Sequence, residues 1–203
     1  MNNQNDMRKT RSKQYMTDAL LSLMQTKDLE KITINDITKN AQVSRSTFYA
    51  QFEDKYDFVN QIIEETMAML RKEILPPQHK KDEPERESHA YYQKHFEFIF
   101  KNSYLFKTML GKHGTPVFRQ KFEECARITY RQVLLELYNN KQLKIPMDYF
   151  IEYIISAHIG LTIQWIHNDF KDSPASMAQL VTELTFHGLM HGLGLDHKVV
   201  LPR

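Results

Sequence analysis

Long stretches of this chain place apolar side chains three or four residues apart, which is the spacing of one face of an α-helix. The clearest stretch contains Met16, Ala19, Leu20, Leu23 and Met24, which recur at i, i+3, i+4, i+7 and i+8. Strands would need frequent turns, yet the 203 residues contain only 6 Gly and 7 Pro. We therefore expect an all-α protein, with about nine helices when the periodic segments are counted.

Proline and charge mark the main break in this helical pattern. Pro76 and Pro77 cannot continue a helix, because neither has a backbone N–H to donate. The following residues, 78–87, are charged and almost free of apolar side chains. We expect a linker there, between an N-terminal domain of residues 1–75 and a C-terminal domain of residues 86–203.

The N-terminal domain shows three short helices with a tight turn between the second and the third. Thr33 and Ser44 are suited to begin the second and third helices, since a hydroxyl can accept hydrogen bonds from first-turn amides. Asp36 stands three residues after Thr33, as in a capping box. This order predicts a helix-turn-helix, in which the third helix enters the major groove of double-stranded DNA. Its outer face holds hydrogen-bond donors and no acid, namely Ser44, Arg45, Ser46, Thr47 and Tyr49.

Residues 32–55 read ITINDITKNAQVSRSTFYAQFEDK and resemble the signature of the tetracycline-repressor (TetR) family. The family pattern runs Ile-Thr, an apolar helix, Ala-Gly-Val-Ser, Thr-Phe-Tyr, Phe and a final Lys. The resemblance covers roughly residues 10–65. It departs at Gln42, where the family has Gly; an L-residue in a left-handed turn there costs about 1 kcal/mol.

The resemblance implies which side chains contact DNA. Arg45, Ser46 and Thr47 would contact bases, and Arg45 can bond a guanine through two hydrogen bonds. Tyr49 would lie along the sugar–phosphate chain, and Lys55 would pair with a phosphate at the start of a fourth helix. The implied DNA-binding set is Thr33, Ser44, Arg45, Ser46, Thr47, Tyr49 and Lys55.

For the C-terminal half, the resemblance implies a helical domain that binds a small effector and dimerises through its last two long helices. Residues 149–170 look like a subgroup that includes dihydroxyacetone-kinase regulators. Residues 150–166 are apolar around more than one face, so both sides of that helix must be buried. We expect one side to meet a second copy across a two-fold axis. The residues expected in the homodimer interface are Ile155, Ile159, Ile163, Leu184 and Gly188.

A concentration of aromatic side chains and Met predicts where an apolar or aromatic effector would bind. The same residue types at helical spacing also make an ordinary core, and the pattern leaves both interpretations open. The expected lining is Tyr92, His95, Phe96, Phe106, Met109, Phe122, His158 and Trp165.

Charge and composition narrow the other possibilities. The formal net charge is only +2, but residues 1–17 hold four basic side chains against one acid, which could contact phosphates or form a solvated end. The single cysteine, Cys125, excludes an internal disulfide. We see no secretory signal, and residues 150–166 fall short of the roughly 20 apolar residues of a membrane span. We expect a cytoplasmic protein.

Competing functions can be stated from the same residues. An enzyme would need a phosphate loop, a nucleophile–base pair or paired carboxylates, and none is evident. His187, His191 and His197 could hold a metal, but no carboxylate or Cys completes the set, so we expect no metal, cofactor or catalytic residue. The expected function is a repressor released by its effector from a near-palindromic operator. The alternatives are an activator of a metabolic operon and a nucleoid or cell-division factor without a sensor.

Overall fold

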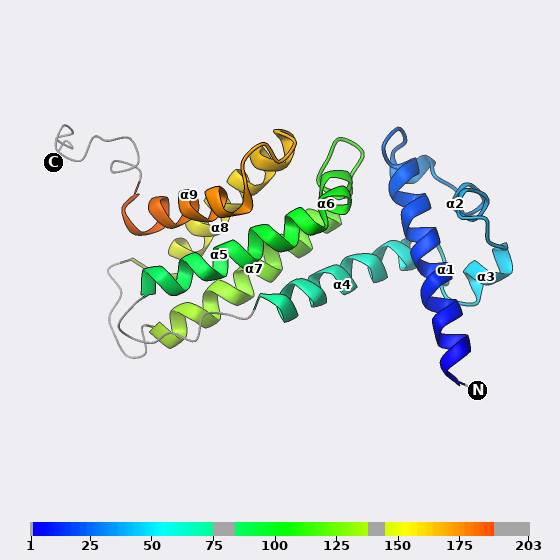
Figure 1. Ribbon diagram of the computed structural model, residues 1–203, viewed down its shortest axis with the longest axis horizontal. Helices are drawn as coiled ribbons and strands as arrows, with labels where there is room; N and C mark the ends of the chain where they lie inside the picture. Colours follow the sequence, from blue (N-terminus) through cyan, green and yellow to red (C-terminus); the bar gives the residue numbers. More distant parts are fainter. Residues whose placement is uncertain (1, 75–83, 138–144, 189–203) are drawn as a thin grey trace. The chain divides into compact units, whose positions relative to one another are not determined.

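The computed structural model describes residues 2–74, 84–137 and 145–188. Within these ranges the regular elements are nine α-helices and one short 3-10 helix, with no strand (Figure 1). The predicted all-α class is confirmed. In chain order the elements are α1 Asn2–Leu23, η1 Leu29–Lys31, α2 Ile34–Asn40, α3 Arg45–Tyr49, α4 Lys55–Glu73, α5 Pro84–Lys101, α6 Ser103–Met109, α7 Pro116–Leu137, α8 Met147–His167 and α9 Pro174–Phe186.

Helix boundaries follow local chemistry. Asp54 accepts hydrogen bonds from two first-turn amides of α4, both at 2.8 Å, and so caps that helix. Pro116 and Pro174 are the first residues of α7 and α9, where a missing N–H breaks no helical hydrogen bond. α1 ends at Leu23. Hydrogen-bonded turns and η1, which the pattern did not predict, occupy the interval before α2.

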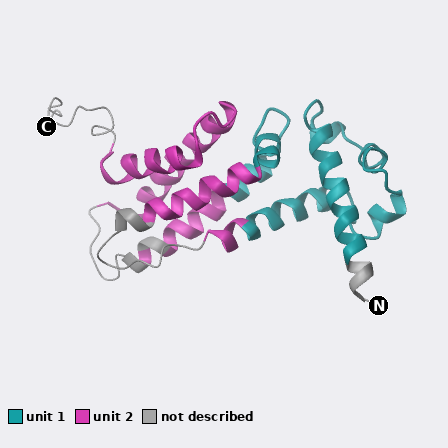
Figure 2. Cartoon of the chain, in the orientation of Figure 1, with its two compact units in different colours: residues 1–69, 103–122 teal, residues 70–102, 123–203 magenta. Residues whose placement is uncertain are grey.

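The chain forms two compact units, which Figure 2 shows in different colours. Unit 1 comprises residues 1–69 and 103–122, and unit 2 comprises residues 70–102 and 123–203. α6 and the start of α7 therefore belong with the N-terminal helices, although the sequence pattern assigned them to the C-terminal domain. The division of function between residues 1–75 and 86–203 stays a prediction.

The core of unit 1 is built from apolar side chains of the helix-turn-helix and of α4. Met16 and Leu20 of α1 are fully buried, as is Phe48 of α3. The Phe48 ring packs against Phe52 and Phe58, with ring centroids 5.2 and 5.6 Å apart. Burying each large side chain contributes about 1.5–3 kcal/mol, so these rings hold α3 firmly on its neighbours.

Unit 1 also includes contacts between α6 and the end of α1. The Gln25 amide donates to the Thr108 hydroxyl at 2.6 Å. In the loop after α6, His113 Nδ1 lies 2.6 Å from Asp28 Oδ1. Lys31 and His113 together lower the pKa of Asp28 to about 2, with the hydrogen bond from Lys31 the larger cause. These polar contacts join the α6 segment to the turn that precedes the helix-turn-helix.

Unit 2 is organised around α5, α8 and α9, of which α5 and α9 pack along each other. Trp165 of α8 is buried, and its ring meets Phe96 of α5 at 5.3 Å and Phe170 at 4.9 Å between centroids. Its indole N–H donates to the Asp172 carbonyl at 2.9 Å. The largest side chain of the unit is therefore both packed and hydrogen-bonded.

Candidate nucleic-acid interface

The start of α2 is closed by a reciprocal hydrogen-bond pair. The Thr33 hydroxyl accepts from the Asp36 amide at 3.1 Å, and the Asp36 carboxylate accepts from the Thr33 amide at 2.9 Å. The hydrogen bond from the Thr33 amide, and then the one that the Thr33 hydroxyl donates to the same carboxylate at 2.7 Å, lower the pKa of Asp36. The predicted capping box is therefore present, and it sets the direction in which α2 leaves the preceding loop.

The turn between α2 and α3 has the geometry that the sequence predicted. Gln42 has a φ of 54°, in the left-handed region that favours Gly. The Val43 amide then donates to the Thr38 carbonyl at 3.0 Å, which holds the turn closed. Ser44 begins α3 by accepting from the Thr47 amide at 3.1 Å. An Asn or Gly would fit at position 42, but Gln adopts the required conformation at a cost in free energy.

α3 presents an exposed polar face. Arg45, Ser46 and Tyr49 are exposed, and Thr47 is half-buried. The Arg45 guanidinium carbon lies 6.0 Å from the Tyr49 ring centroid, a cation–π distance that keeps both side chains on one side of the helix. The Ser44 hydroxyl is within 2.8 Å of the hydroxyls of Ser46 and Thr47. The structure thus brings five of the seven predicted DNA-contact residues together on α3 and its cap.

Lys55 is placed differently from what the family pattern implies. Its ammonium donates to three backbone carbonyls, those of Leu29 at 2.6 Å, Ile32 at 2.8 Å and Glu30 at 3.2 Å. An ammonium group has three N–H donors, so these carbonyls use all of them. The structure gives Lys55 a structural role at the end of η1, which no local sequence signal indicated. Its contact with a DNA phosphate stays a prediction.

The predicted effector residues fall into two groups. Phe106, Met109 and Phe122 are buried in unit 1, where the Phe106 and Phe122 ring centroids lie 5.6 Å apart. The others belong to unit 2 and are Tyr92, His95, Phe96, His158 and Trp165. The sequence pattern treated all eight as one lining, because periodicity cannot tell which unit a helix joins.

A hydrogen-bonded chain of half-buried polar side chains lies in unit 2. The Tyr130 hydroxyl bonds to His158 Nδ1, and His158 Nε2 lies 3.1 Å from the Thr185 hydroxyl. The Tyr92 ring meets the His158 ring edge-on at 5.2 Å. Burial lowers the pKa of His158, and that of His95, to about 4, so both imidazoles are neutral at pH 7. The sequence pattern missed Tyr130 and Thr185, since neither stands out from its helix.

The predicted dimer residues are partly covered by their own chain. Ile155 and Ile159 are buried in unit 2 and leave little surface for a partner. Ile163, Leu184 and Gly188 are half-buried. The exposed stripe of α8 instead carries residues spaced three or four apart, namely Tyr149, Tyr153, Ser156, Gly160 and Gln164.

Two family models match the chain. The model described as "Bacterial regulatory proteins, tetR family" matches residues 17–62, and the one described as "Transcriptional regulator C-terminal region" matches residues 86–187. The second match alone covers half of the chain. The chain belongs to the TetR family.

Individual relatives of this TetR-family regulator are distant. A curated relative, the uncharacterised helix-turn-helix regulator YxbF of Bacillus subtilis, is 24% identical over 169 residues, which are 82% of this chain and 43% of YxbF. The chain thus spans less than half the length of that relative.

Solved structures share the fold of this TetR-family regulator. A TetR regulator from Streptococcus agalactiae is 23% identical, with a TM-score of 0.64, over 89% of this chain and 96% of that one. The Bacillus subtilis regulator FadR, solved with stearoyl-CoA, is 16% identical, with a TM-score of 0.60, over 87% and 98%. The dihydroxyacetone kinase operon activator DhaS is also 16% identical, with a TM-score of 0.54, over 87% and 94%. At these identities the likenesses show a shared fold.

Other classes of site gain no support in the part of this TetR-family regulator that the structure describes. That part holds no group of three or more His, Cys, Asp or Glu side chains placed to bind a metal. Of the three histidines considered for a metal, His187 is described, whereas His191 and His197 lie outside the described residues. No described helix is long and apolar enough to cross a membrane.

Proposed function

We propose that this TetR-family regulator is a homodimeric repressor that leaves its operator when a small molecule binds in unit 2. The observation that carries the proposal is the exposed, acid-free face of α3, held by the Ser44 cap. Donors of this size reach base edges and phosphates, and the absence of carboxylates avoids repulsion from DNA. A repressor works beside the chromosome, so we place the protein in the cytoplasm.

Specificity is assigned to the first turn of α3. Arg45 is the side chain with two parallel donors, which is the arrangement that a guanine accepts. Ser46 and Thr47 follow it and offer hydroxyl groups to the bases. Tyr49, at the end of α3, would contact the sugar–phosphate backbone of the DNA. Thr33, at the start of α2, adds a phosphate contact. Two copies of α3 related by a two-fold axis would read half-sites about one helical turn apart, ~10 bp or a multiple of it.

Dimerisation is assigned to the outer faces of α8 and α9. Tyr149 and Tyr153 are 74% and 70% exposed, which leaves large aromatic surfaces uncovered in one chain. Leu180 and Phe186 of α9 are also exposed. Gly160 continues the exposed stripe of α8 beyond Tyr153 and Ser156, and a Cβ added there would meet nothing within 4 Å. A smooth stripe with exposed aromatics suits the close crossing of two helices from a partner chain.

The effector is assigned to the ring cluster of unit 2, in which Phe96 and Trp165 are buried and His95 and His158 are half-buried. Phe96 and Trp165 offer apolar surface, and His158 and His95 are neutral groups that can hydrogen-bond without carrying charge. The solved complex of FadR with stearoyl-CoA supports an apolar molecule as the class to test first. We therefore propose an effector with an apolar or aromatic body.

The DNA-binding assignment is tested by selecting duplexes from a random pool with the full-length protein and measuring affinity by fluorescence anisotropy. The Arg45→Ala variant should lose about 1–3 kcal/mol on the selected site and little on random DNA. Unchanged base preference would contradict the placement of α3 in the groove. Transcription in vitro from the selected site then separates a repressor from an activator.

The dimer and the effector have their own tests. Gly160→Leu should shift sedimentation toward the monomer, while Ala90→Leu, on an exposed position of α5, should not. Acyl-CoA thioesters of graded chain length and simple aromatic acids, added one at a time, should raise the melting temperature and release DNA if unit 2 is a sensor. A protein that no member of the panel stabilises would favour the sensorless alternative.

A further inference from the structure

A hollow of about 420 Å³ opens beside the C-terminal end of α3, within unit 1. Its walls come from three parts of the chain: Lys9 and Lys13 from α1, Gln51 from the segment after α3, and Glu65 from α4. Phe52 lies against it as the apolar side. The hollow therefore borders the residues that directly follow α3, Ala50 and Gln51, and none of the proposed base contacts lines it.

A hydrogen-bond bridge attaches this part of α1 to α3. The side-chain amide of Gln51 donates to the Ser12 hydroxyl of α1 at 3.0 Å and to the Thr47 carbonyl of α3 at 3.3 Å. Lys9 is three residues before Ser12, so the two side chains lie on neighbouring positions of one face of α1. Gln51 therefore links the turn of α1 that carries Lys9 to the end of α3.

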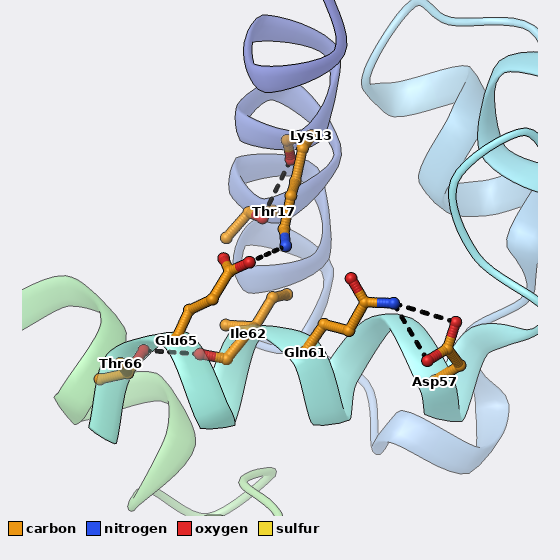
Figure 3. A network of polar contacts seen from close by, with 7 residues as sticks. All are labelled: Lys13, Thr17, Asp57, Gln61, Ile62, Glu65 and Thr66. Atoms are coloured by element: carbon orange, nitrogen blue, oxygen red, sulfur yellow. Dashed lines mark hydrogen bonds and ion pairs between the residues drawn. The ribbon is translucent and has the colours of Figure 1, made fainter. Parts of the chain in front are cut away.

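The charges around the hollow are unequal. Lys13 is paired with Glu65 (Figure 3). Its ammonium also lies 5.7 Å from the Phe52 ring centroid. Only 19% of the Lys13 side chain is exposed, compared with 59% of that of Glu65. Lys9 is exposed. The charged side chains that line the hollow are therefore two lysines, Lys9 and Lys13, and one carboxylate, Glu65, which is paired with Lys13.

We propose that this hollow is a second DNA contact, in which Lys9 takes a backbone phosphate flanking the bases read by α3. The inference rests on the proposed DNA-binding function and extends its footprint from α2 and α3 to α1. Double-stranded DNA carries one charge per about 1.7 Å of axis, so a duplex lying on α3 presents phosphates on both sides of the contacted bases. Glu65 keeps Lys13 out of this contact and sets how strongly the hollow attracts an anion.

The test compares three single-charge variants of the full-length protein. Lys9→Gln removes the proposed phosphate contact, and Glu65→Gln removes the carboxylate and releases Lys13. Lys112→Gln is the matched control, because Lys112 is exposed and lies far from Lys9. Its neighbour His113 contacts Asp28, which follows the C-terminal end of α1. That end of α1 is about 20 Å from Lys9 along the helix axis. Affinity for a random 30-bp duplex is measured as a function of salt, with unfolding midpoints recorded for each variant.

The proposal makes opposite predictions for the two test variants. Lys9→Gln should reduce the slope of log K against log salt by about 0.9 per bound chain and weaken binding about five- to tenfold at 0.1 M salt. Glu65→Gln should tighten binding severalfold. Lys112→Gln should match the wild-type protein.

Three results would overturn the proposal. A slope for Lys9→Gln equal to that of Lys112→Gln would show that α1 does not contact DNA, while the contacts of α3 would stand. Weaker binding by Glu65→Gln, with a lower unfolding midpoint, would show that the ion pair only holds α1 on α4. A wild-type protein that binds no DNA at all would remove the proposed function and this extension together.

Discussion

Lys55 provides the sharpest test of the structure. Its ammonium donates to three backbone carbonyls, whereas the TetR family pattern implies that it contacts a DNA phosphate. The Lys55→Met variant keeps most of the aliphatic side chain and removes the ammonium. The carbonyls of Leu29 and Ile32 are part-buried and would lose a charged donor, and that of Glu30 is exposed and would turn to water. A hydrogen bond to a charged group is worth about 1.5–3 kcal/mol, and water compensates part of each loss.

We therefore expect Lys55→Met to lower the free energy of unfolding by about 3 kcal/mol, taking the lower bound for each of the two part-buried carbonyls. For a chain of this size, the melting temperature should fall by roughly 6–12 °C. Urea unfolding followed by circular dichroism at 222 nm, at a fixed protein concentration, measures the change. Lys39→Met, at an exposed position of α2, is the control and should stay within about 0.5 kcal/mol of wild type.

The Lys55→Met variant also tests the other role, in which the Lys55 ammonium contacts a DNA phosphate. If Lys55→Met unfolded like the wild-type protein while its salt slope on random DNA fell by about 0.9 per chain, the ammonium would be a phosphate contact. That result would refute the structural role argued from the three carbonyls. A destabilised variant with a wild-type salt slope, measured well below its melting temperature, would support it.

Three other features give predictions of their own. Gln42→Gly should raise the free energy of unfolding by about 0.5–1 kcal/mol, since it relieves a left-handed residue; a decrease in urea midpoint would contradict the observed φ. Ser44→Ala should lower the free energy of unfolding by about 1 kcal/mol because it removes the cap of α3, whereas Ser44→Gly should lower it by only a few tenths of a kcal/mol. Thermal melts of both variants measure the difference. Folding lowers the pKa of His95 and of His158 from 6.5 to about 4, so both are neutral in the folded protein. Their contribution to the free energy of unfolding is fully present above pH 6.5 and is lost as the pH falls toward 4. The loss should reach at most about 1.4 kcal/mol per pH unit for each histidine, and His158→Gln should flatten the urea midpoint against pH.

The elements that sequence predicts well here are those governed by neighbours in the chain. Thr33 and Ser44 cap their helices because a hydroxyl finds amides two or three residues away, whatever the rest of the fold does. The left-handed turn at Gln42 follows from its place between two such helices. The exposed face of α3 follows from the 3.6-residue period once Phe48 is taken as buried.

The features that sequence did not predict depend on contacts between distant segments. The carbonyls that accept from Lys55 come from η1 and from Ile32, the residue after it, more than twenty positions earlier in the chain. Ile155 and Ile159 belong to a helix with apolar side chains on several faces, and periodicity alone cannot say which face its own bundle covers. The grouping of the predicted effector residues into two units has the same origin.

The composition of unit 1 has a consequence for how this protein can be cut and recombined. A fragment ending near residue 75 would contain every helix of the DNA-binding motif. It would lack α6, including Thr108, which accepts from Gln25, and it would lack His113, one of the two partners of Asp28. Fusing that fragment to the C-terminal half of another regulator would replace those partners with unrelated side chains. A working chimera should therefore carry residues 103–122 along with the N-terminal segment, so that two separate stretches of sequence move as one module.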